Sequence, residues 1–324
     1  MAKKRMIQAI NEALDGEMQR DHKLILFGED VEISLFGDTK GLVDKYGTDR
    51  IRNTPISETV MSGMAVGAAA AGFNVICHMM FGNFMYTGFD SIANQASKLR
   101  YMTAGQISLP IVYMSVFGGG RSAAAQHSDA MHPLFMNLGG IKVVTPSSPM
   151  DAAGLLRASI RDPNPVVYLQ AAGRGGELGD VPDEEFVIEL GKAARLRNGE
   201  DLTIVAIGAM VRHALRSVDF QRKKGVSIEL IDPRTLVPLD KEMIFKSVRK
   251  TGRLIIVDEA RDTCSAASHI ASLCAEECFS ALKAPIKRVT VNDIAIPYSP
   301  PLEKNVLPNE ERINNTVSEI LKFT

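Results

Sequence analysis

The sequence of 324 residues contains few cysteines and no surplus of either charge. Its four cysteines are spread through a long chain whose first residues lack the apolar core of a secretion signal. We therefore expect reduced thiols and a cytoplasmic location. The 37 Lys and Arg residues balance 38 Asp and Glu residues, so the chain has no overall basic field that would attract nucleic acid or an anionic membrane.

Charged residues are absent from positions 59–89, a stretch long enough to span a bilayer. Gly72, Asn74 and Gly82 interrupt this stretch, which is rich in Ala and Gly rather than in Leu, Ile and Phe. A helix, a turn and a buried strand therefore explain it better than a membrane span, and we expect no membrane partner.

Several common catalytic motifs are also absent: the GxSxG elbow, the Walker P-loop, HExxH and paired CxxC. Gly118, Gly120 and Ala123 do form a GxGxxA after an expected strand, which is the pattern of a nicotinamide-dependent oxidoreductase. The acidic residue expected about twenty positions later is missing, because that segment offers Thr145 and Ser147. Nicotinamide binding is therefore a distant alternative.

The chain is longer than a single core normally allows, which favours two domains. Short apolar runs rich in Val and Ile alternate with segments of helical length, and this alternation predicts an α/β fold with a mainly parallel sheet. The expected strands are 23–27, 73–77, 110–116, 141–145 and 166–169, and the expected helices are 5–18, 58–71, 84–102 and 150–160.

A segment rich in glycine and acidic residues, 173–185, interrupts this alternation and indicates a domain boundary. We place a first domain at residues 1–185 and a smaller α/β domain at residues 186–324. The strands expected in the second domain are 202–207, 227–231, 254–257 and 287–291.

Glu58 begins an otherwise uncharged helix rich in Ala and Gly, with Ser57 at the N-cap position. A carboxylate beside so much apolar surface must be paired, protonated or functional. The alternative is that Glu58 only complements the positive end of the helix and faces water.

His127 follows a strand that ends in three glycines. Ligands of open α/β sheets gather at the carboxyl ends of strands, and histidine titrates near neutral pH, so His127 is a candidate for proton transfer. The alternative is an ordinary polar residue without a catalytic role.

Five segments of the sequence match the pattern of one known family: TPISETVMSGMAVGAAAAGF, NFMYTGFDSIANQASKLRYM, AAAQHSDAMHPLF, LIDPRTLVPLD and AIPYSPPLEKNVLPNEERI. Taken together, they resemble the beta subunit of thiamine diphosphate-dependent 2-oxoacid dehydrogenases. Pyruvate, branched-chain and acetoin dehydrogenases are similar. The resemblance covers nearly the whole chain in the same order. It implies a transketolase-like, pyrimidine-binding first domain and a C-terminal domain of the transketolase type.

The resemblance also implies roles for individual residues. Glu58 matches the glutamate that hydrogen-bonds the aminopyrimidine ring of the cofactor and promotes loss of the thiazolium proton. Phe84 matches the aromatic residue that packs on the pyrimidine ring. His127 matches the histidine on the substrate and acyl-transfer side of the pocket.

The family implies a second chain as well. Thiamine diphosphate enzymes hold Mg²⁺ and the diphosphate with a GDG motif followed by Asn-Asn, and this sequence lacks that combination. The resemblance therefore implies an alpha-type subunit that carries it, a heterotetramer of two alpha and two beta subunits, and a lipoyl acyltransferase that receives the acyl group.

This sequence departs from the family pattern around the pocket. His132 lies in a segment that differs from the family after QHS, and His78 and Gln170 stand where a glutamate is common. Arg121 replaces a small residue in the glycine loop. We take Arg121 and His132 as candidates for substrate selection; a surface salt bridge is the alternative for Arg121.

The segment IRDPNP coincides with a structural site for a monovalent cation, K⁺, in some members of the family. The resemblance implies ligands from Asp162, Asn164 and the carbonyl groups of Ala158 and Ile160. A capped turn before Pro165 is the alternative.

The function implied is decarboxylation of a 2-oxoacid, or cleavage of an acyloin, with transfer of the acyl group to a lipoyl carrier. A related carboligase or decarboxylase without a lipoyl partner is the second interpretation, and a noncatalytic scaffold is the third.

Overall fold

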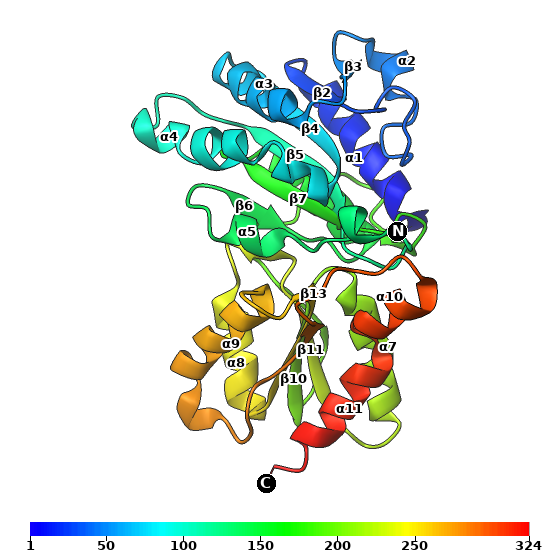
Figure 1. The fold of residues 1–324 in the computed structure, drawn as a ribbon, viewed down its shortest axis with the longest axis vertical. Helices are drawn as coiled ribbons and strands as arrows, with labels where there is room; N and C mark the ends of the chain where they lie inside the picture. Colours follow the sequence, from blue (N-terminus) through cyan, green and yellow to red (C-terminus); the bar gives the residue numbers. More distant parts are fainter. Residues whose placement is uncertain (324) are drawn as a thin grey trace. The chain divides into compact units, whose positions relative to one another are not determined.

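The computed structural model describes residues 1–323 and groups them into two compact units (Figure 1). The first unit contains residues 1–117 and 134–190, and the second contains residues 118–133 and those from 191 onward. Both units are α/β, which confirms the predicted fold class. Residues 118–133, which the sequence pattern places in the first domain, cluster with the second unit.

The strands of the first unit are β1 (Ala2–Arg5), β2 (Leu24–Gly28), β3 (Ile51–Asn53), β4 (Asn74–Phe81), β5 (Ile111–Phe117), β6 (Lys142–Val144), β7 (Val166–Ala171) and β8 (Leu178–Val181). Its helices are α1 (Met6–Arg20), α2 (Leu42–Tyr46), α3 (Glu58–Ala70), η1 (Gly82–Tyr86), η2 (Ser91–Ala96), α4 (Leu99–Met102), most of α5 (His132–Met136) and α6 (Pro149–Ile160). The main sheet runs β6-β7-β5-β4-β2-β3 with every pair parallel, and β1 and β8 form a separate antiparallel pair.

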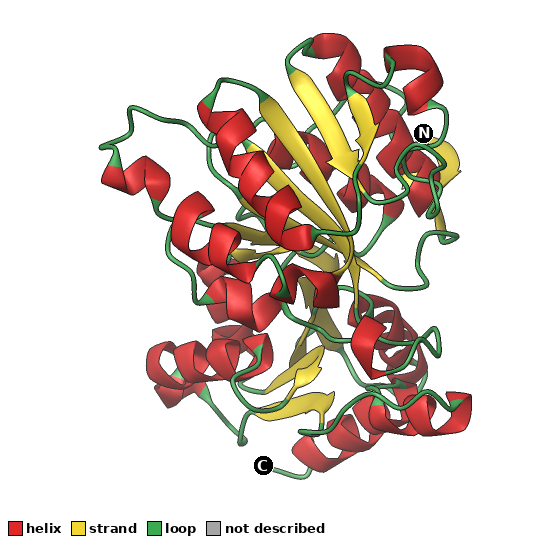
Figure 2. Ribbon diagram, turned by 45° about the horizontal axis from the view of Figure 1, so that its top comes forward, coloured by secondary structure: helices red, strands yellow, loops and turns green. Residues whose placement is uncertain are grey.

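Helices cover both faces of this parallel sheet (Figure 2). Tyr113 of β5 donates its hydroxyl hydrogen to the carbonyl of Ser62 on α3 at 3.1 Å. Tyr168, which pairs with Met114 of β5, donates instead to the carbonyl of Ala152 on α6 at 2.8 Å. Because successive residues of a strand point to opposite faces, α3 and α6 lie on opposite sides of the sheet. This double cover explains why all seven residues of β5 are buried apolar or small side chains.

The uncharged segment 59–89 forms most of α3, a turn, β4 and η1, so the expected helix, turn and strand are confirmed. Among residues 1–323, no helix is long and apolar enough to cross a membrane.

The prediction of a single helix over 84–102 is wrong, because this segment forms three separate helical pieces, η1, η2 and α4. Gly88 lies at the break. A Cβ atom there would stand 2.6 Å from the hydroxyl of Ser62 and 2.8 Å from the carbonyl oxygen of Glu58. The chain therefore passes too close to α3 for a continuous helix with a side chain at this position.

The second unit contains η3 (Ala125–His127), β9 (Ala194–Arg197), β10 (Leu202–Ala206), α7 (Met210–Arg222), β11 (Ile228–Asp232), β12 (Thr235–Val237), α8 (Lys241–Thr251), β13 (Leu254–Arg261), α9 (Ala266–Glu277), η4 (Phe279–Ala281), β14 (Lys287–Val291), α10 (Pro300–Val306) and α11 (Glu310–Ile320). Its sheet runs β14-β13-β10-β11-β9, and only the edge strand β9 is antiparallel to its neighbour.

Capping residues mark several helix starts. Ser148 of α6, Asp240 of α8, Ser265 of α9 and Asn309 of α11 each accept a hydrogen bond from a backbone N–H of the first turn. Ser57 does occupy the N-cap position of α3, as expected, but its side chain makes no capping hydrogen bond.

Candidate active site

The carboxyl edge of the first unit's sheet brings together the residues that follow β2, β3 and β4. In the parallel register Gly28 of β2 stands beside both Asn53 of β3 and His78 of β4. Gly28 has no room for a side chain, because a Cβ atom would collide with the backbone of His78. The next residue, Glu29, is thereby placed against the end of β4, at the edge where open parallel sheets bind ligands.

Glu58 is the first residue of α3 and is half-buried. The start of α3 is tied to the segment after η1, because Thr59 Oγ1 donates to the carbonyl of Thr87 at 2.7 Å. Thr87 Oγ1 in turn donates to the carbonyl of Phe84 at 2.7 Å. The structure therefore brings the backbone segments of Glu58 and Phe84 together.

Glu29 is a second carboxylate that the sequence-based interpretation missed. Its side chain is buried, and Oε1 has no hydrogen-bond partner among residues 1–323. Burial raises the pKa of Glu29, and the negative charges of Glu58 and Asp30 raise it further. A nearby His78 acts in the opposite direction. The available signal was the acidic pair directly after the apolar run of β2.

Phe84 belongs to a short series of aromatic rings. Its ring packs edge-on against Phe81 with centroids 5.6 Å apart, and Phe81 packs edge-on against Phe36 at 5.4 Å. Phe36 also stacks on the imidazole of His78 at 6.0 Å. These contacts connect the loop after β2 with η1, so the position of Phe84 depends on both segments.

In the second unit the glycine loop that follows β5 wraps around two carboxylates. Glu303 accepts hydrogen bonds from the backbone N–H groups of Gly120 at 2.8 Å and Ser122 at 2.9 Å. Glu259 accepts one from Gly119 at 3.1 Å. Successive N–H groups of this kind form an anion-binding concavity, which is filled here by side chains of the same unit. The N–H groups that a dinucleotide would need are thus engaged, which removes the support for nicotinamide binding.

Arg121 and His127 belong to the segment that this contact holds. Arg121 is exposed, and His127 ends η3 and is half-buried. The backbone between them is strained, because Ser122 and Ala124 have φ values of 52° and 62°. Such strain persists only where surrounding contacts impose it, and it is concentrated at functional sites.

His132 lies deeper in the same unit. Its side chain has no exposed surface, and Nε2 stands 3.0 Å from Oδ1 of Asp258, which is equally buried. Burial alone would raise the pKa of Asp258, but the charge and contact of His132 together with backbone hydrogen bonds hold it below its usual value. The geometry anchors the segment 128–133 to β13 and gives His132 no surface for a substrate.

The segment expected to bind K⁺ follows α6. The Nζ atom of Lys142 forms an ion pair with Asp162, and Oδ1 of Asn164 accepts a hydrogen bond from Arg100 at 2.8 Å. Asp162 also accepts the backbone N–H of Asn164 at 2.9 Å, which is the capped turn named above as the alternative. Ala158 and Ile160 lie in the last turn of α6. Within residues 1–323 no group of three or more His, Cys, Asp or Glu side chains could hold a metal ion.

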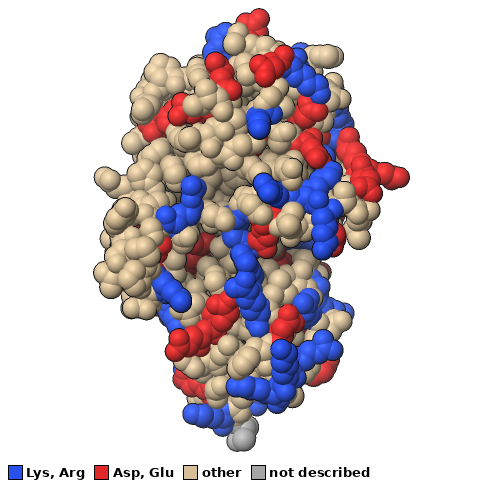
Figure 3. Space-filling model, turned by 90° about the vertical axis from the view of Figure 1, so that its right-hand side faces the viewer, with Lys and Arg blue, Asp and Glu red and all other residues tan. Residues whose placement is uncertain are grey.

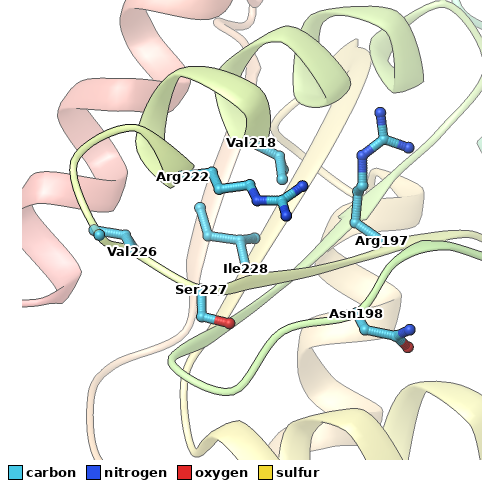
Figure 4. Close-up of a pocket in the computed structure, with 8 residues that line it drawn as sticks. Arg197, Asn198, Val218, Arg222, Val226, Ser227 and Ile228 are labelled. Atoms are coloured by element: carbon cyan, nitrogen blue, oxygen red, sulfur yellow. The ribbon is translucent and has the colours of Figure 1, made fainter.

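A pocket of about 490 Å³ in the second unit contains none of the predicted site residues (Figure 4). Arg197 of β9 and Arg222 of α7 are among the residues that line it, and Arg197 contacts Asp219 at 3.4 Å. Elsewhere, basic and acidic side chains are interspersed on the face shown in Figure 3. This mixture matches the balanced net charge.

Two family models match the chain: "Transketolase, pyrimidine binding domain" at residues 2–170 and "Transketolase, C-terminal domain" at residues 191–313. Among solved structures, "Split gene transketolase, inactive beta4 tetramer" has a TM-score of 0.82, covers 98% of this chain and 99% of its own, and shares 22% identity, which shows a common fold.

Curated relatives match over almost their full length. The acetoin:2,6-dichlorophenolindophenol oxidoreductase subunit beta of Bacillus subtilis (strain 168) is 41% identical over 98% of this chain and 96% of its own. The pyruvate dehydrogenase E1 component subunit beta of the same organism is 39% identical over 100% of both. The 2-oxoisovalerate dehydrogenase subunit beta of Bacillus subtilis (strain 168) is 37% identical over 98% of this chain and 98% of its own. The chain therefore belongs to the transketolase-like family of dehydrogenase beta subunits.

Proposed function

We propose that this chain forms the pyrimidine-binding half of a thiamine diphosphate site and works with an alpha-type subunit. The observation that carries the proposal is the grouping of Glu58, Glu29 and Phe84 at one sheet edge. Glu58 supplies a carboxylate at the start of α3, and Glu29 supplies a buried carboxylate oxygen, Oε1, without a partner in residues 1–323. Together with the aromatic ring of Phe84, these groups suit a flat ligand ring that donates hydrogen bonds.

In this proposal Glu58 accepts a hydrogen bond from a ring nitrogen of the aminopyrimidine, and Phe84 supports one face of that ring. Burial and the charge of Glu58 raise the pKa of Glu29, so Glu29 retains a proton more tightly than it would in water. When bound, thiamine diphosphate supplies the electron sink that cleavage next to a carbonyl group requires.

The alpha-type subunit supplies what this sequence lacks, a GDG motif followed by Asn-Asn that holds Mg²⁺ and the diphosphate. Apolar side chains near the start of α3 support a partner there: Ile56, Val60 and Met64 are 83%, 62% and 42% exposed. Large exposed apolar residues in a group mark interaction sites. A heterotetramer of two alpha and two beta subunits in the cytoplasm is the proposed assembly.

The proposed reaction is decarboxylation of a 2-oxoacid or cleavage of an acyloin, with the acyl group passed to a lipoyl carrier. His127 donates and accepts protons on the substrate side of the pocket, and Arg121 attracts an anionic group of the substrate. The second candidate is a carboligase or decarboxylase without a lipoyl partner, which is favoured by the altered segment after His127. Reduction of lipoamide by the assembled enzyme separates the two.

The experiment that tests the proposal measures thiamine diphosphate binding with Mg²⁺ by calorimetry. The chain is measured alone and then in complex with the alpha-type subunit recovered by affinity pull-down from its native lysate. Binding is expected only in the complex and is expected to be lost in Glu58→Gln but kept in the exposed control Glu184→Gln. A complex that binds no cofactor would overturn the proposal.

A further inference from the structure

We infer that His78, held by Asp38, is a positioning residue that shapes a bulge at Met80 and thereby sets the orientation of Phe84. The contacts of His78 with Asp38 and Met80 do not depend on the proposed function. Their consequence for the cofactor rests on the proposed role of Phe84.

The bulge interrupts the pairing of β4 with β5. His78 pairs with Met114, and pairing resumes only at Phe81 with Val116, so β4 contains one more residue than its partner strand here. Met80 adopts a φ of 50°, which is unfavourable for a residue with a side chain. Bulges leave a backbone group without a ladder partner and redirect the strand.

His78 supplies the missing partner. The backbone N–H of Met80 donates to Nδ1 of His78 at 3.3 Å. On the other side of the ring, Nε2 of His78 lies 2.9 Å from Oδ2 of Asp38. Both side chains are almost completely buried, at 3% and 2% exposure. The imidazole therefore connects the loop after β2 with the end of β4.

These two contacts specify one form of the imidazole ring. The N–H of Met80 can only donate, so Nδ1 of His78 must be the acceptor and carries no proton. The carboxylate of Asp38 accepts, so the single ring proton lies on Nε2. The neutral Nε2–H form satisfies both neighbours at once, and a proton on Nδ1 would face the N–H of Met80.

The effect of His78 reaches Phe84 by two routes. Along the chain, η1 begins directly after β4, so the direction in which the bulge sends the backbone decides where Phe84 lies. Through space, Phe36 stacks on His78 and packs edge-on against Phe81, which packs edge-on against Phe84. Loss of His78 removes the support of the backbone and of the ring series together.

His78 and Asp38 also suit each other chemically. A glutamate at position 78 would place a second carboxylate against Asp38, and one of the two would have to be neutral. The histidine avoids this conflict because its Nε2–H donates to Asp38 while Nδ1 still serves Met80.

The first test reads the proton positions of the His78 ring directly. The full chain is labelled with ¹⁵N-histidine, and the ring nitrogens are read by long-range ¹H–¹⁵N NMR; the chain has only six histidines, and His78 is identified by the signal that disappears in His78→Asn. A neutral ring with its proton on Nε2 is expected. A proton on Nδ1, alone or together with Nε2, would overturn the inference.

The second test separates the two contacts by substitution. His78→Asn keeps an acceptor at the position of Nδ1, His78→Gln keeps a polar group at the position of Nε2, and His78→Phe keeps only the stacked ring. The exposed His22→Gln is the matched control. Each variant is assembled with the alpha-type subunit, and thiamine diphosphate affinity is measured by calorimetry beside the melting temperature.

His22→Gln is expected to bind the cofactor as well as the natural chain. His78→Asn keeps an acceptor for the N–H of Met80 but loses the stacked ring and the donor to Asp38, so its affinity is expected to lie between that of the natural chain and that of the other two variants. His78→Gln and His78→Phe are expected to bind roughly tenfold more weakly, since a buried N–H is left without an acceptor. Equal affinities of His78→Asn and His78→Phe in folded complexes would overturn the inference. A natural complex that binds no cofactor would instead contradict the proposed function, while the NMR result still decides the role of His78.

Discussion

Oε1 of Glu303 accepts the backbone N–H of Gly120 at 2.8 Å. The other oxygen of the same carboxylate accepts the N–H of Ser122 at 2.9 Å. Gly120 has a φ of 95°, a conformation that glycine adopts without strain. The loop that carries Arg121 is thus shaped around a side chain of its own unit, and its conformation does not require a bound ligand.

Replacement of Glu303 by Gln should destabilise the second unit. The amide offers one acceptor instead of two, and its NH₂ group would face the N–H of Ser122. We expect the free energy of unfolding to fall by about 1–3 kcal/mol, the cost of a buried polar group without its partner. Urea denaturation followed by circular dichroism measures the change. Glu311→Gln, an exposed neighbour on α11, is the control, and equal stability of the two variants would contradict this role.

Replacement of Glu29 by Gln should stabilise the first unit at neutral pH. Burial and the charge of Glu58 raise the pKa of Glu29 above its unfolded value. The folded chain then holds the proton more tightly, so this contribution to stability is complete below the unfolded pKa and is lost as pH rises through the raised pKa.

The difference between Glu29→Gln and the natural chain should therefore be small near pH 4 and grow toward pH 8. Thermal melting across this range measures it, with the exposed Glu184→Gln as the control. A constant difference at every pH would show that the charge of Glu29 does not oppose folding.

Glu310, the first residue of α11, should behave in the opposite way. Burial acts to raise the pKa of Glu310, but its own backbone N–H and contacts from Arg216 and His213 outweigh burial and hold the pKa at about 2. The two partners lie 3.0 and 3.1 Å from the carboxylate. Because the folded pKa is depressed, the stabilisation is present above the unfolded pKa of about 4.5 and is lost as pH falls through about 2.

Glu310→Gln should then cost about 1 kcal/mol of unfolding free energy at pH 7, a small value because the ion pairs are partly exposed to solvent. The difference from the natural chain should shrink between pH 4.5 and 2. Chemical denaturation at several pH values is the measurement, and a loss that persists at pH 2 would point to packing rather than charge.

Potassium should have little effect on the natural chain, because Lys142 already pairs with Asp162. In Lys142→Met the carboxylate loses this cation, and K⁺ should then raise the melting temperature relative to choline at equal ionic strength. Sodium at the same concentration is the control for ion size. A clear rise in the natural chain would instead support direct binding of K⁺ by the turn after α6.

The local pattern determined much of the first unit. The apolar runs of β4 and β5 are buried on both faces, and hydrophobicity along the chain is sufficient to recognise such strands. Glu58 could be found because it is a lone carboxylate before a long uncharged segment. The broken helix over 84–102 could not be predicted, since the break at Gly88 depends on α3, a segment that is distant in the sequence.

What the sequence by itself determined is the family and the α/β class, because both can be recognised from residues that are close along the chain. Glu58, Phe84 and His127 are the candidate site residues that the same local patterns predict. Only the tertiary structure placed Glu29 beside Glu58 and closed the glycine loop on Glu303, 183 residues after Gly120. The physical reason is that hydrogen bonds and charges act through space, whereas a pattern of residues records only neighbours in the sequence.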